Sequence, residues 1–188
     1  MIALGADHGG YKLKEEIKKY FEEKNIEYRD FGTDSEERTD YPIYAKKVAE
    51  AIQKKECDCG ILVCRSGYGM TVVANKFKGI RAAAIHDEES AKYAKADDDI
   101  NVITLGGDYL TTNEAICIIR NWLGTEFKGG RYEERLKIAS DLQGLNKENY
   151  NTVLKIIKAF QVSESAKILG IDPSKLSELV KEKESQQV

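Results

Sequence analysis

Proline, histidine and cysteine are scarce in this chain: its 188 residues include only 2 prolines, 2 histidines and 4 cysteines. A composition of 41% hydrophobic and 32% charged residues excludes collagen-like and disordered classes. No apolar run approaches the roughly 20 residues that a membrane-spanning helix needs. The opening "MIALGADHGG" also lacks the basic and apolar regions of a signal peptide. We therefore expect a globular cytoplasmic protein without a membrane partner.

Charge and thiol content exclude further classes. The chain carries 29 basic and 32 acidic residues, a net charge of −3, so no global positive field attracts nucleic acid or an anionic membrane. Any anion site must be local. The cysteines form no paired CxxC motifs, which indicates free thiols. Cys57 and Cys59 have only His8 and His86 as further soft ligands, none at zinc spacing, so we expect no metal and no cofactor.

Short apolar runs alternate with amphipathic helical stretches along most of the chain. This alternation predicts about five strands, each followed by a helix, in a parallel sheet covered on both faces. The expected fold is a doubly wound, Rossmann-like α/β/α sandwich, with ligands beyond the carboxyl ends of the strands. The predicted strands cover residues 2–6, 26–32, 59–64, 80–85 and 100–106, and the predicted helices 12–25, 41–56, 69–77, 88–96 and 111–124.

A different segment follows the predicted α/β domain of residues 1–143. Residues 144–188 read as a helical extension with a frayed polar end. Within it, apolar side chains on both sides of a turn between Gly170 and Pro173 have a spacing that fits a helix-turn-helix. The alternative is a helical hairpin that packs on the main domain or on a partner subunit. We favour the hairpin, because "PSKLSELVKEKE" is not basic enough to neutralise many DNA phosphates.

Two predicted loops carry residues suited to chemistry. "GADHGG" places Asp7 and His8 at the end of the first strand, followed by glycines that allow a close backbone approach; a capped structural histidine is the alternative. In "CRSGYG", Cys64 ends a strand just before a helix, whose amino-terminal field favours a reactive thiolate. Cys64 is therefore a candidate base or nucleophile, and a buried inert cysteine is the alternative.

A pair of arginines supplies a candidate local anion site. Arg131 and Arg135 in "GGRYEER" are four residues apart and share one face of a predicted helix. Two adjacent guanidinium groups suit a phosphate dianion. The alternative is that they form surface ion pairs with Glu133 and Glu134.

Five segments together resemble the RpiB/LacAB family of sugar-phosphate isomerases. They are "GADHGG", "TDYP", the block from Gly60 to Ala84, "INVITLGG" and "GGRYEERL", in this order over residues 1–143. The resemblance implies a five-stranded Rossmann-like sheet and a homodimer or homotetramer whose active sites are shared between subunits. It also implies a metal-free aldose–ketose isomerisation of a phosphorylated sugar through an enediolate.

The resemblance also implies roles for individual residues. Cys64 matches the base that moves a proton between C2 and C1 of the sugar. Ser66, Gly67 and Gly69 match the loop that stabilises the enediolate oxygens. The positions that match substrate-binding residues are Asp7, His8, Tyr41, Arg131 and Arg135.

Four positions depart from the family pattern. Arg65 replaces a glycine, Asp97 and Asp98 replace a His-Asn pair whose histidine opens the sugar ring, and Asp108 replaces an arginine. Three carboxylates would repel a phosphate, so we expect Arg65 to pair across the subunit boundary with at least one of them; the alternative is a solvent-exposed Arg65 and solvated acids. Asp97 would then accept the ring-opening proton. A carboxylate is less able than an imidazole both to accept this proton and to donate one to the ring oxygen. This difference predicts slow turnover of cyclic substrates or a different sugar.

The expected activity is the interconversion of ribose 5-phosphate and ribulose 5-phosphate. One alternative keeps the chemistry but changes the sugar, for example to a hexose 6-phosphate. Another is a catalytically weak sugar-phosphate sensor whose tail binds DNA or a protein. The presence of Cys64 argues against a sensor, which needs no base.

Overall fold

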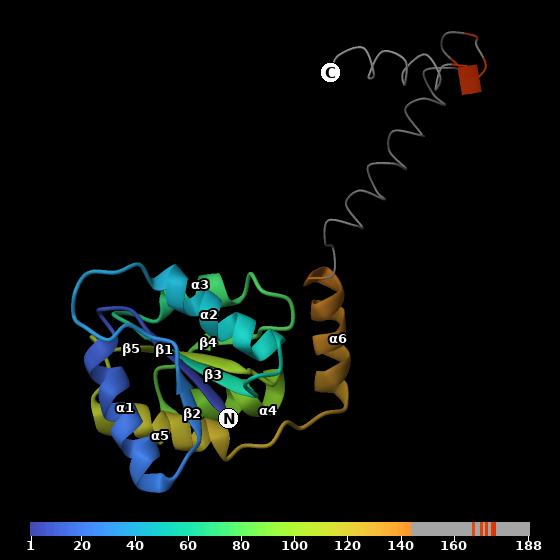
Figure 1. The fold of residues 1–188 in the computed structure, drawn as a ribbon. Coiled ribbons are helices and arrows are strands. Elements are labelled where there is room, and N and C mark those ends of the chain that lie inside the picture. Colours follow the sequence, from blue (N-terminus) through green and yellow to red (C-terminus); the bar gives the residue numbers. More distant parts are fainter. Residues whose placement is uncertain (144–166, 168–169, 171, 173, 176–188) are drawn as a thin grey trace. The chain divides into compact units, whose positions relative to one another are not determined.

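The computed structural model describes residues 1–143 and, in the rest of the chain, positions 167, 170, 172, 174 and 175 (Figure 1). The chain divides into two units, Met1–Ser140 and Asp141–Val188. The predicted helical extension of residues 144–188, with its possible helix-turn-helix, lies outside the described residues apart from those positions. None of the helices in the described part of the chain is long and apolar enough to cross a bilayer.

Five parallel strands form a single sheet in the order β2-β1-β3-β5-β4. β1 is the switch point, because the chain leaves it for β2 on one side and returns to β3 on the other. This sheet confirms the predicted doubly wound α/β fold. The strands are β1 (Ile2–Ala6), β2 (Tyr28–Asp30), β3 (Cys59–Cys64), β4 (Ala82–Ala84) and β5 (Val102–Gly106).

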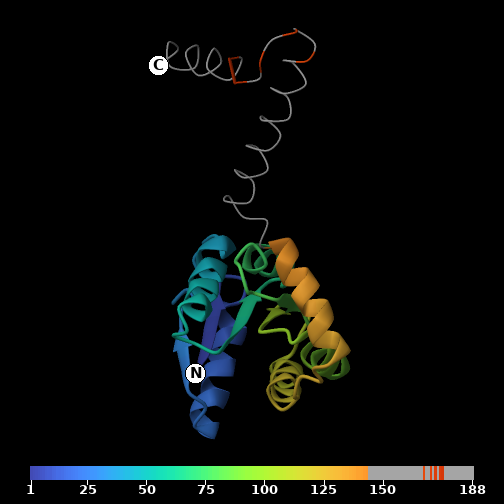
Figure 2. The same cartoon turned by 90° about the vertical axis from the view of Figure 1, so that its right-hand side faces the viewer.

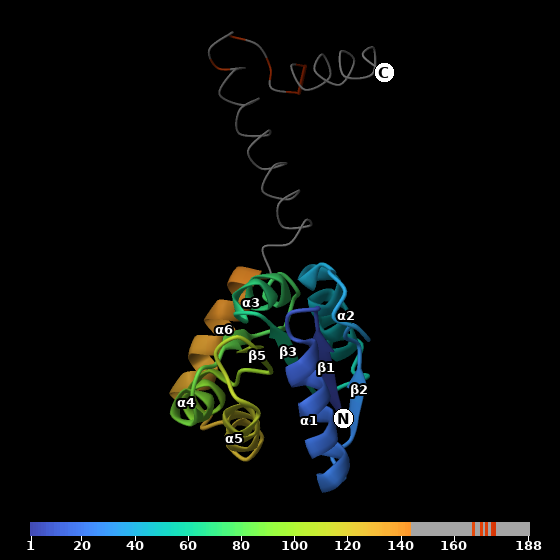
Figure 3. The same cartoon turned by 90° about the vertical axis from the view of Figure 1, so that its left-hand side faces the viewer.

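Helices cover both faces of the sheet (Figures 1 and 3). α2 and α3 lie on one face, and α1, α4 and α5 lie on the other, with α4 beside α5. Figure 2 shows the two layers from the side. The helices are α1 (Tyr11–Lys24), α2 (Tyr41–Gln53), α3 (Tyr68–Ala74), α4 (Glu88–Asp98), α5 (Thr112–Leu123) and α6 (Arg131–Gln143).

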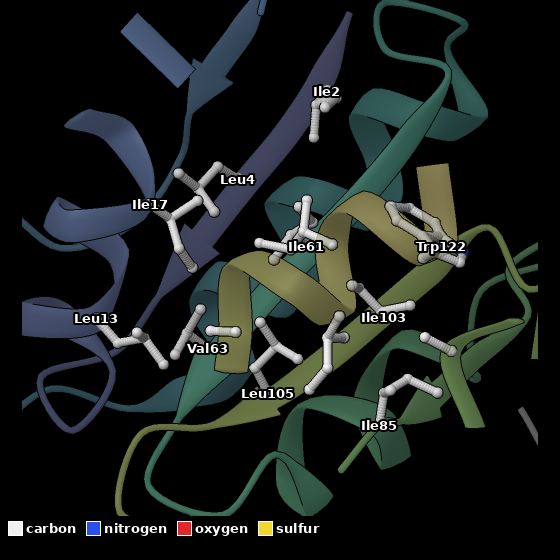
Figure 4. Close-up of a cluster of buried hydrophobic side chains, with 14 of the residues drawn as sticks. Ile2, Leu4, Leu13, Ile17, Ile61, Val63, Ile85, Ile103, Leu105 and Trp122 are labelled. Carbon is white, nitrogen blue, oxygen red and sulfur yellow. The ribbon is translucent and has the colours of Figure 1, made fainter. Parts of the chain in front are cut away.

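The alternation of side chains along each strand divides the core into two clusters. Ile61 and Val63 of β3 point toward α1 and α5, whereas Leu62 and Cys64 point toward α2 and α3. Figure 4 shows the larger cluster, in which Ile17 and Trp122 pack against strand residues. Both faces of the sheet are covered by buried apolar side chains, which is why the strands are almost continuous apolar runs in the sequence.

Side-chain caps define where two of the helices begin. Asp87 accepts a hydrogen bond from the Ser90 amide at the start of α4, and Thr111 accepts one from the Glu114 amide at the start of α5. Both are reciprocal capping boxes, which satisfy amide groups that the helix leaves without partners. They fix where the loops after β4 and β5 end.

Candidate active site

Three loops meet at the carboxyl ends of the adjacent strands β1, β3 and β5. The amide of Gly107 donates to the carbonyl of Cys64 at 2.8 Å, and the amide of Asp108 donates to the carbonyl of Arg65 at 3.0 Å. Gly10 lies so close to β3 that a Cβ there would be 2.3 Å from the Val63 carbonyl oxygen. Glycine is required at this position because the backbones touch. Main-chain contacts therefore join the loops beside the crevice where doubly wound folds bind ligands.

Cys64 is the last residue of β3 and is 6% exposed. The amide of Gly67 donates a hydrogen bond to its Sγ at 3.1 Å. Gly67 has φ +82°, a backbone conformation that a residue with a side chain adopts only with strain. One backbone donor is therefore aimed at the sulfur.

Asp7 lies across from Cys64 at the end of β1 and is 6% exposed. Its Oδ1 accepts hydrogen bonds from the amides of Gly9 at 2.9 Å and Gly10 at 3.1 Å. Burial raises the pKa of the Asp7 carboxyl above its usual value, while the two amides and the charges of His8 and Arg65 oppose the rise. The site thus contains a buried carboxylate with one oxygen held by the backbone.

The β2–α2 loop fixes His8 and Tyr41. The main-chain oxygen of Thr39 lies 3.0 Å from His8 Nδ1, and the Thr39 amide lies 3.3 Å from the same atom. Either tautomer is held by this loop, which leaves Nε2 as the atom that can meet a ligand. The Tyr41 ring packs over Gly69, where a Cβ would lie 2.8 Å from its Cζ. Both side chains are therefore at the same edge of the sheet as Cys64.

Arg65 forms an ion pair with Asp108, with 3.6 Å between Nη1 and Oδ2. The sequence predicts that Arg65 pairs with an acid across a subunit boundary. For Asp108 this expectation is wrong, because Arg65 pairs with Asp108 of the same chain. They meet because the loops after β3 and β5 are joined by the main-chain hydrogen bonds described above. Both side chains are more than half exposed, so the pair contributes little to stability.

The structure places Asp97 and Asp98 at the opposite edge of the sheet. They end α4, just before the first residue of β5, and the carbonyl of Asp98 accepts a hydrogen bond from Arg81 at the start of β4. These two edges are the amino and the carboxyl ends of the strands. The length of β3 from Gly60 to Cys64 puts about 13 Å between them. Neither acid pairs with Arg65 in this chain, and Asp97 forms an ion pair with Lys128 instead.

Arg131 and Arg135 also lie on that far side, in the first turns of α6. Their guanidinium carbons lie 4.9 and 5.7 Å from the centroid of the Tyr132 ring. In the described part of the chain, neither arginine pairs with Glu133 or Glu134, so the surface ion pairs that were the alternative to a phosphate site are not formed. The two guanidinium groups lie near one ring, as a shared ligand would require.

Sequence reasoning missed three residues that shape these regions. Thr39 acts through its backbone, and a main-chain partner leaves no signal in the residue type. Lys14 is buried beneath the β2–α2 loop, although its place in a charged helix predicts exposure. Lys128 carried a detectable signal, because it precedes Arg131 by three residues in the basic stretch "KGGR".

The remaining thiols show no sign of a site. All four cysteines are free, and burial raises the pKa of Cys59 to about 11, which keeps it a neutral thiol. Among residues 1–143 and the other described positions, no group of three His, Cys, Asp or Glu side chains is arranged to hold a metal ion.

Comparison with known proteins gives one consistent family. The sequence model of the family described as Ribose/Galactose Isomerase matches residues 2–138. Ribose-5-phosphate isomerase B of Escherichia coli is 41% identical over 142 residues, which are 76% of this chain and 95% of that protein. Ribose-5-P isomerase B of Listeria innocua is 38% identical over 146 residues, 78% of this chain and 99% of that protein.

Solved structures agree with the sequence comparison. The ribose 5-phosphate isomerase of Thermotoga maritima superposes with a TM-score of 0.73 at 41% identity, covering 74% of this chain and 97% of that chain. The ribose-5-phosphate isomerase B of Mycoplasma genitalium, solved with bound ribulose-5-phosphate, has a TM-score of 0.73 at 32% identity and covers 77% and 97% of the two chains.

Proposed function

This chain belongs to the ribose/galactose isomerase family, and we propose from this premise that it interconverts ribose 5-phosphate and ribulose 5-phosphate. It is accordingly an isomerase. The observation that carries the proposal is the position of Cys64, buried at the carboxyl edge of the sheet with the Gly67 amide on its sulfur. Relatives of nearly the same length as the described domain are ribose-5-phosphate isomerases, and one was solved with ribulose-5-phosphate.

Cys64 acts as the base in this proposal. Its thiolate takes the proton from C2 of the open-chain aldose, and the resulting enediolate carries the negative charge on its oxygens. The same thiol then returns the proton to C1, and the proton of the O2 hydroxyl moves to O1, which gives the ketose with a carbonyl group at C2 and a hydroxyl group at C1. The Ser66 hydroxyl and the Gly69 amide stabilise the enediolate oxygens, whereas the Gly67 amide donates to the Cys64 sulfur.

Asp7, His8 and Tyr41 bind the sugar. The Oδ1 of Asp7 is occupied by two backbone amides, so Oδ2 is the atom suited to accept a hydrogen bond from a sugar hydroxyl. His8 presents Nε2 because Thr39 holds Nδ1. Arg65 and Asp108 lie at the rim of this half of the site as an exposed ion pair.

We also propose that the complete site forms between two copies of the chain. Asp98 lies at the amino ends of the strands, about 13 Å along β3 from Cys64, and Arg131 and Arg135 follow Lys128, which contacts the end of α4 on that same side. Exposed apolar side chains beside the Cys64 loop offer a surface for a second copy, among them Ile43 (49% exposed), Tyr68 (55%) and Val72 (58%). A homodimer, alone or within a tetramer, would bring the arginines of one copy to the Cys64 loop of the other.

The direct test is an isomerisation assay with ribose 5-phosphate. Cys64→Ala should lower kcat about a thousandfold, the order of magnitude that a general base contributes, and should leave the fold intact. Cys117→Ala is the matched control, because it removes a thiol from α5, away from the three loops. Activity of the Cys64→Ala protein equal to that of the control would refute Cys64 as the base.

The choice of sugar needs a separate comparison. Asp97, Asp98 and Asp108 place carboxylates where the family pattern has neutral or cationic groups, which favours testing a hexose 6-phosphate beside the pentose. A kcat/KM higher for the hexose than for ribose 5-phosphate would retain the enediolate chemistry and change the substrate. Binding of both sugars without turnover of either would favour the sensor reading.

A further inference from the structure

Three cationic side chains gather around the ring of Tyr132. Lys128 Nζ lies 5.2 Å from the ring centroid, and the guanidinium carbons of Arg131 and Arg135 lie 4.9 and 5.7 Å from it. The Tyr132 hydroxyl also accepts a hydrogen bond from Arg131 Nη2 at 3.0 Å. Like charges this close repel one another, so the arrangement favours a bound anion.

The carboxylate that pairs with this cluster is Asp97. Its Oδ1 lies 2.5 Å from Lys128 Nζ, and the side chains of Asp97 and Lys128 are 28% and 48% exposed. The main-chain amide of Lys128 donates to the carbonyl of Ala96 at 3.0 Å, which fixes the lysine at the end of α4. Asp97 raises the pKa of the Lys128 ammonium, so Lys128 stays charged. With one carboxylate facing three cations, the cluster keeps a net positive charge.

We propose that Lys128 is a third phosphate-binding residue beside Arg131 and Arg135, and that Asp97 is the counter-ion that positions Lys128 until phosphate replaces it. This inference rests on the proposed function, since it names the groups that hold the substrate's phosphate. The two arginines supply planar donor forks, and the lysine supplies a compact point charge on a flexible stem. It also gives Asp97 a role other than the ring-opening proton transfer expected from the sequence, because its carboxylate is engaged by the ammonium group.

The test measures binding rather than turnover, so it can fail independently of the proposed function. Calorimetric titration of the full-length chain with inorganic phosphate involves no isomerisation, and titration with ribose 5-phosphate in a Cys64→Ala background gives the affinity for the sugar without turnover. Lys128→Met should weaken both by about tenfold, because one charge-assisted contact is lost. Lys128→Arg should restore the affinity to within about threefold of the native value, because it keeps the cation.

Lys137→Met is the matched control. It removes a lysine from α6 two residues beyond Arg135, at an exposed position outside the cluster, and should leave both affinities unchanged. If Lys128→Met binds inorganic phosphate as tightly as Lys137→Met, Lys128 is not part of the phosphate site and the proposal is overturned.

Asp97→Asn tests the counter-ion role. It removes the anion that competes for Lys128 but keeps an oxygen that can accept from the ammonium, so affinity for inorganic phosphate should rise about threefold. In the Lys128→Met background the same change should bring no such gain, because Asp97 acts through Lys128. An unchanged affinity in the native background, or an equal gain in both backgrounds, would overturn this role.

Discussion

At the scale of single residues, the site contains a carboxylate whose burial opposes its charge. Asp7 is buried at the end of β1, and burial raises the pKa of its carboxyl above the ordinary value near 4. A raised pKa in the folded state means that the folded chain binds this proton more tightly than the unfolded chain does. Stability is therefore lost as the pH rises from about 4 through the higher folded pKa.

Asp7→Asn should accordingly be more stable than the native protein at pH 7 and less active. The amide oxygen of asparagine can still accept from Gly9 and Gly10, while the cost of a buried charge disappears. Thermal unfolding should show a higher Tm for the variant at pH 7 and little difference below about pH 3, where both side chains are uncharged. Isomerisation should fall, because the carboxylate no longer binds the sugar.

Asp108→Asn is the control for this pH dependence. It makes the same change of charge at the rim of the site, where the side chain is 51% exposed, and should shift Tm little at either pH. A Tm difference for Asp7→Asn that is the same at pH 3 and pH 7 would show that the charge of Asp7 is not its cause.

The residue types in the sequence predict which side chains can react better than they predict which residues position those side chains. The sequence places Asp7, His8 and Cys64 at strand ends, because each follows an apolar run and precedes glycine or a helix. It does not indicate that His8 is held by Thr39, whose contribution is a main-chain oxygen and amide that any residue possesses. It also leaves Asp97 open, because its partner Lys128 is 31 residues away.

At the scale of elements, a buried lysine anchors the loop that carries Thr39 and leads to Tyr41. Lys14 Nζ in α1 lies 2.6 Å from Asp30 Oδ2 and 2.7 Å from the Thr33 carbonyl oxygen, and its side chain is 2% exposed. Together with a backbone amide from Gly32, it lowers the pKa of the Asp30 carboxyl against the effect of burial. The contact joins α1, β2 and the beginning of the loop.

Lys14→Met should destabilise the protein by about 3 kcal/mol, because it leaves a partly buried carboxylate without its main partner. The lowered pKa of Asp30 means that the pair stabilises the fold above about pH 4 and that this stability is lost as the pH falls through the folded pKa. Urea unfolding should therefore show a difference between variant and native protein that shrinks in acid.

Lys12→Met separates burial from charge in this experiment. Lys12 lies one half-turn earlier in α1 and pairs with Glu36, but its side chain is 78% exposed. Its removal should change the free energy of unfolding by less than about 1 kcal/mol. Equal losses for the Lys12 and Lys14 variants would contradict the anchoring role of Lys14.

Most helices and strands could be predicted from the sequence, because the faces that each of them buries leave a pattern of apolar residues. Strands covered on both faces are short apolar runs, and their helices show one apolar face, so each segment signals its type locally. The last predicted turn of the helix after Cys64 is absent, since α3 ends at Ala74. The order β3-β5-β4 had no such local signal, because it depends on which helices pack together across the sheet.

At the scale of the whole molecule, the groups proposed to act on one sugar lie at two edges of one sheet. Cys64, Asp7 and His8 are at the carboxyl ends of the strands, whereas Arg131 and Arg135 lie in α6, on the side of the amino ends of the strands. The sequence motifs predict each of these residues. They do not predict the distance between the two groups, because a motif carries no spatial information about another motif. Family resemblance implies shared sites, and the geometry of one chain supplies the physical reason for them.

Sharing predicts that two inactive variants recover activity when they are mixed. A chain with Cys64→Ala keeps its arginines, and a chain with Arg131→Ala and Arg135→Ala keeps its thiol. In a dimer of one copy each, one site has both lesions and the other has neither. Random mixing makes half of the dimers heterodimers with one intact site of two, so co-expression should restore about a quarter of native kcat per site.

The matched control pairs two lesions in the same half of the site. Cys64→Ala mixed with Asp7→Asn gives heterodimers in which each carboxyl-edge half carries one lesion, so recovery should not exceed the residual activity of Asp7→Asn alone. If Cys64→Ala mixed with the double arginine variant also shows no recovery, although native mass measurement confirms heterodimers, the arginines do not serve the partner's thiol.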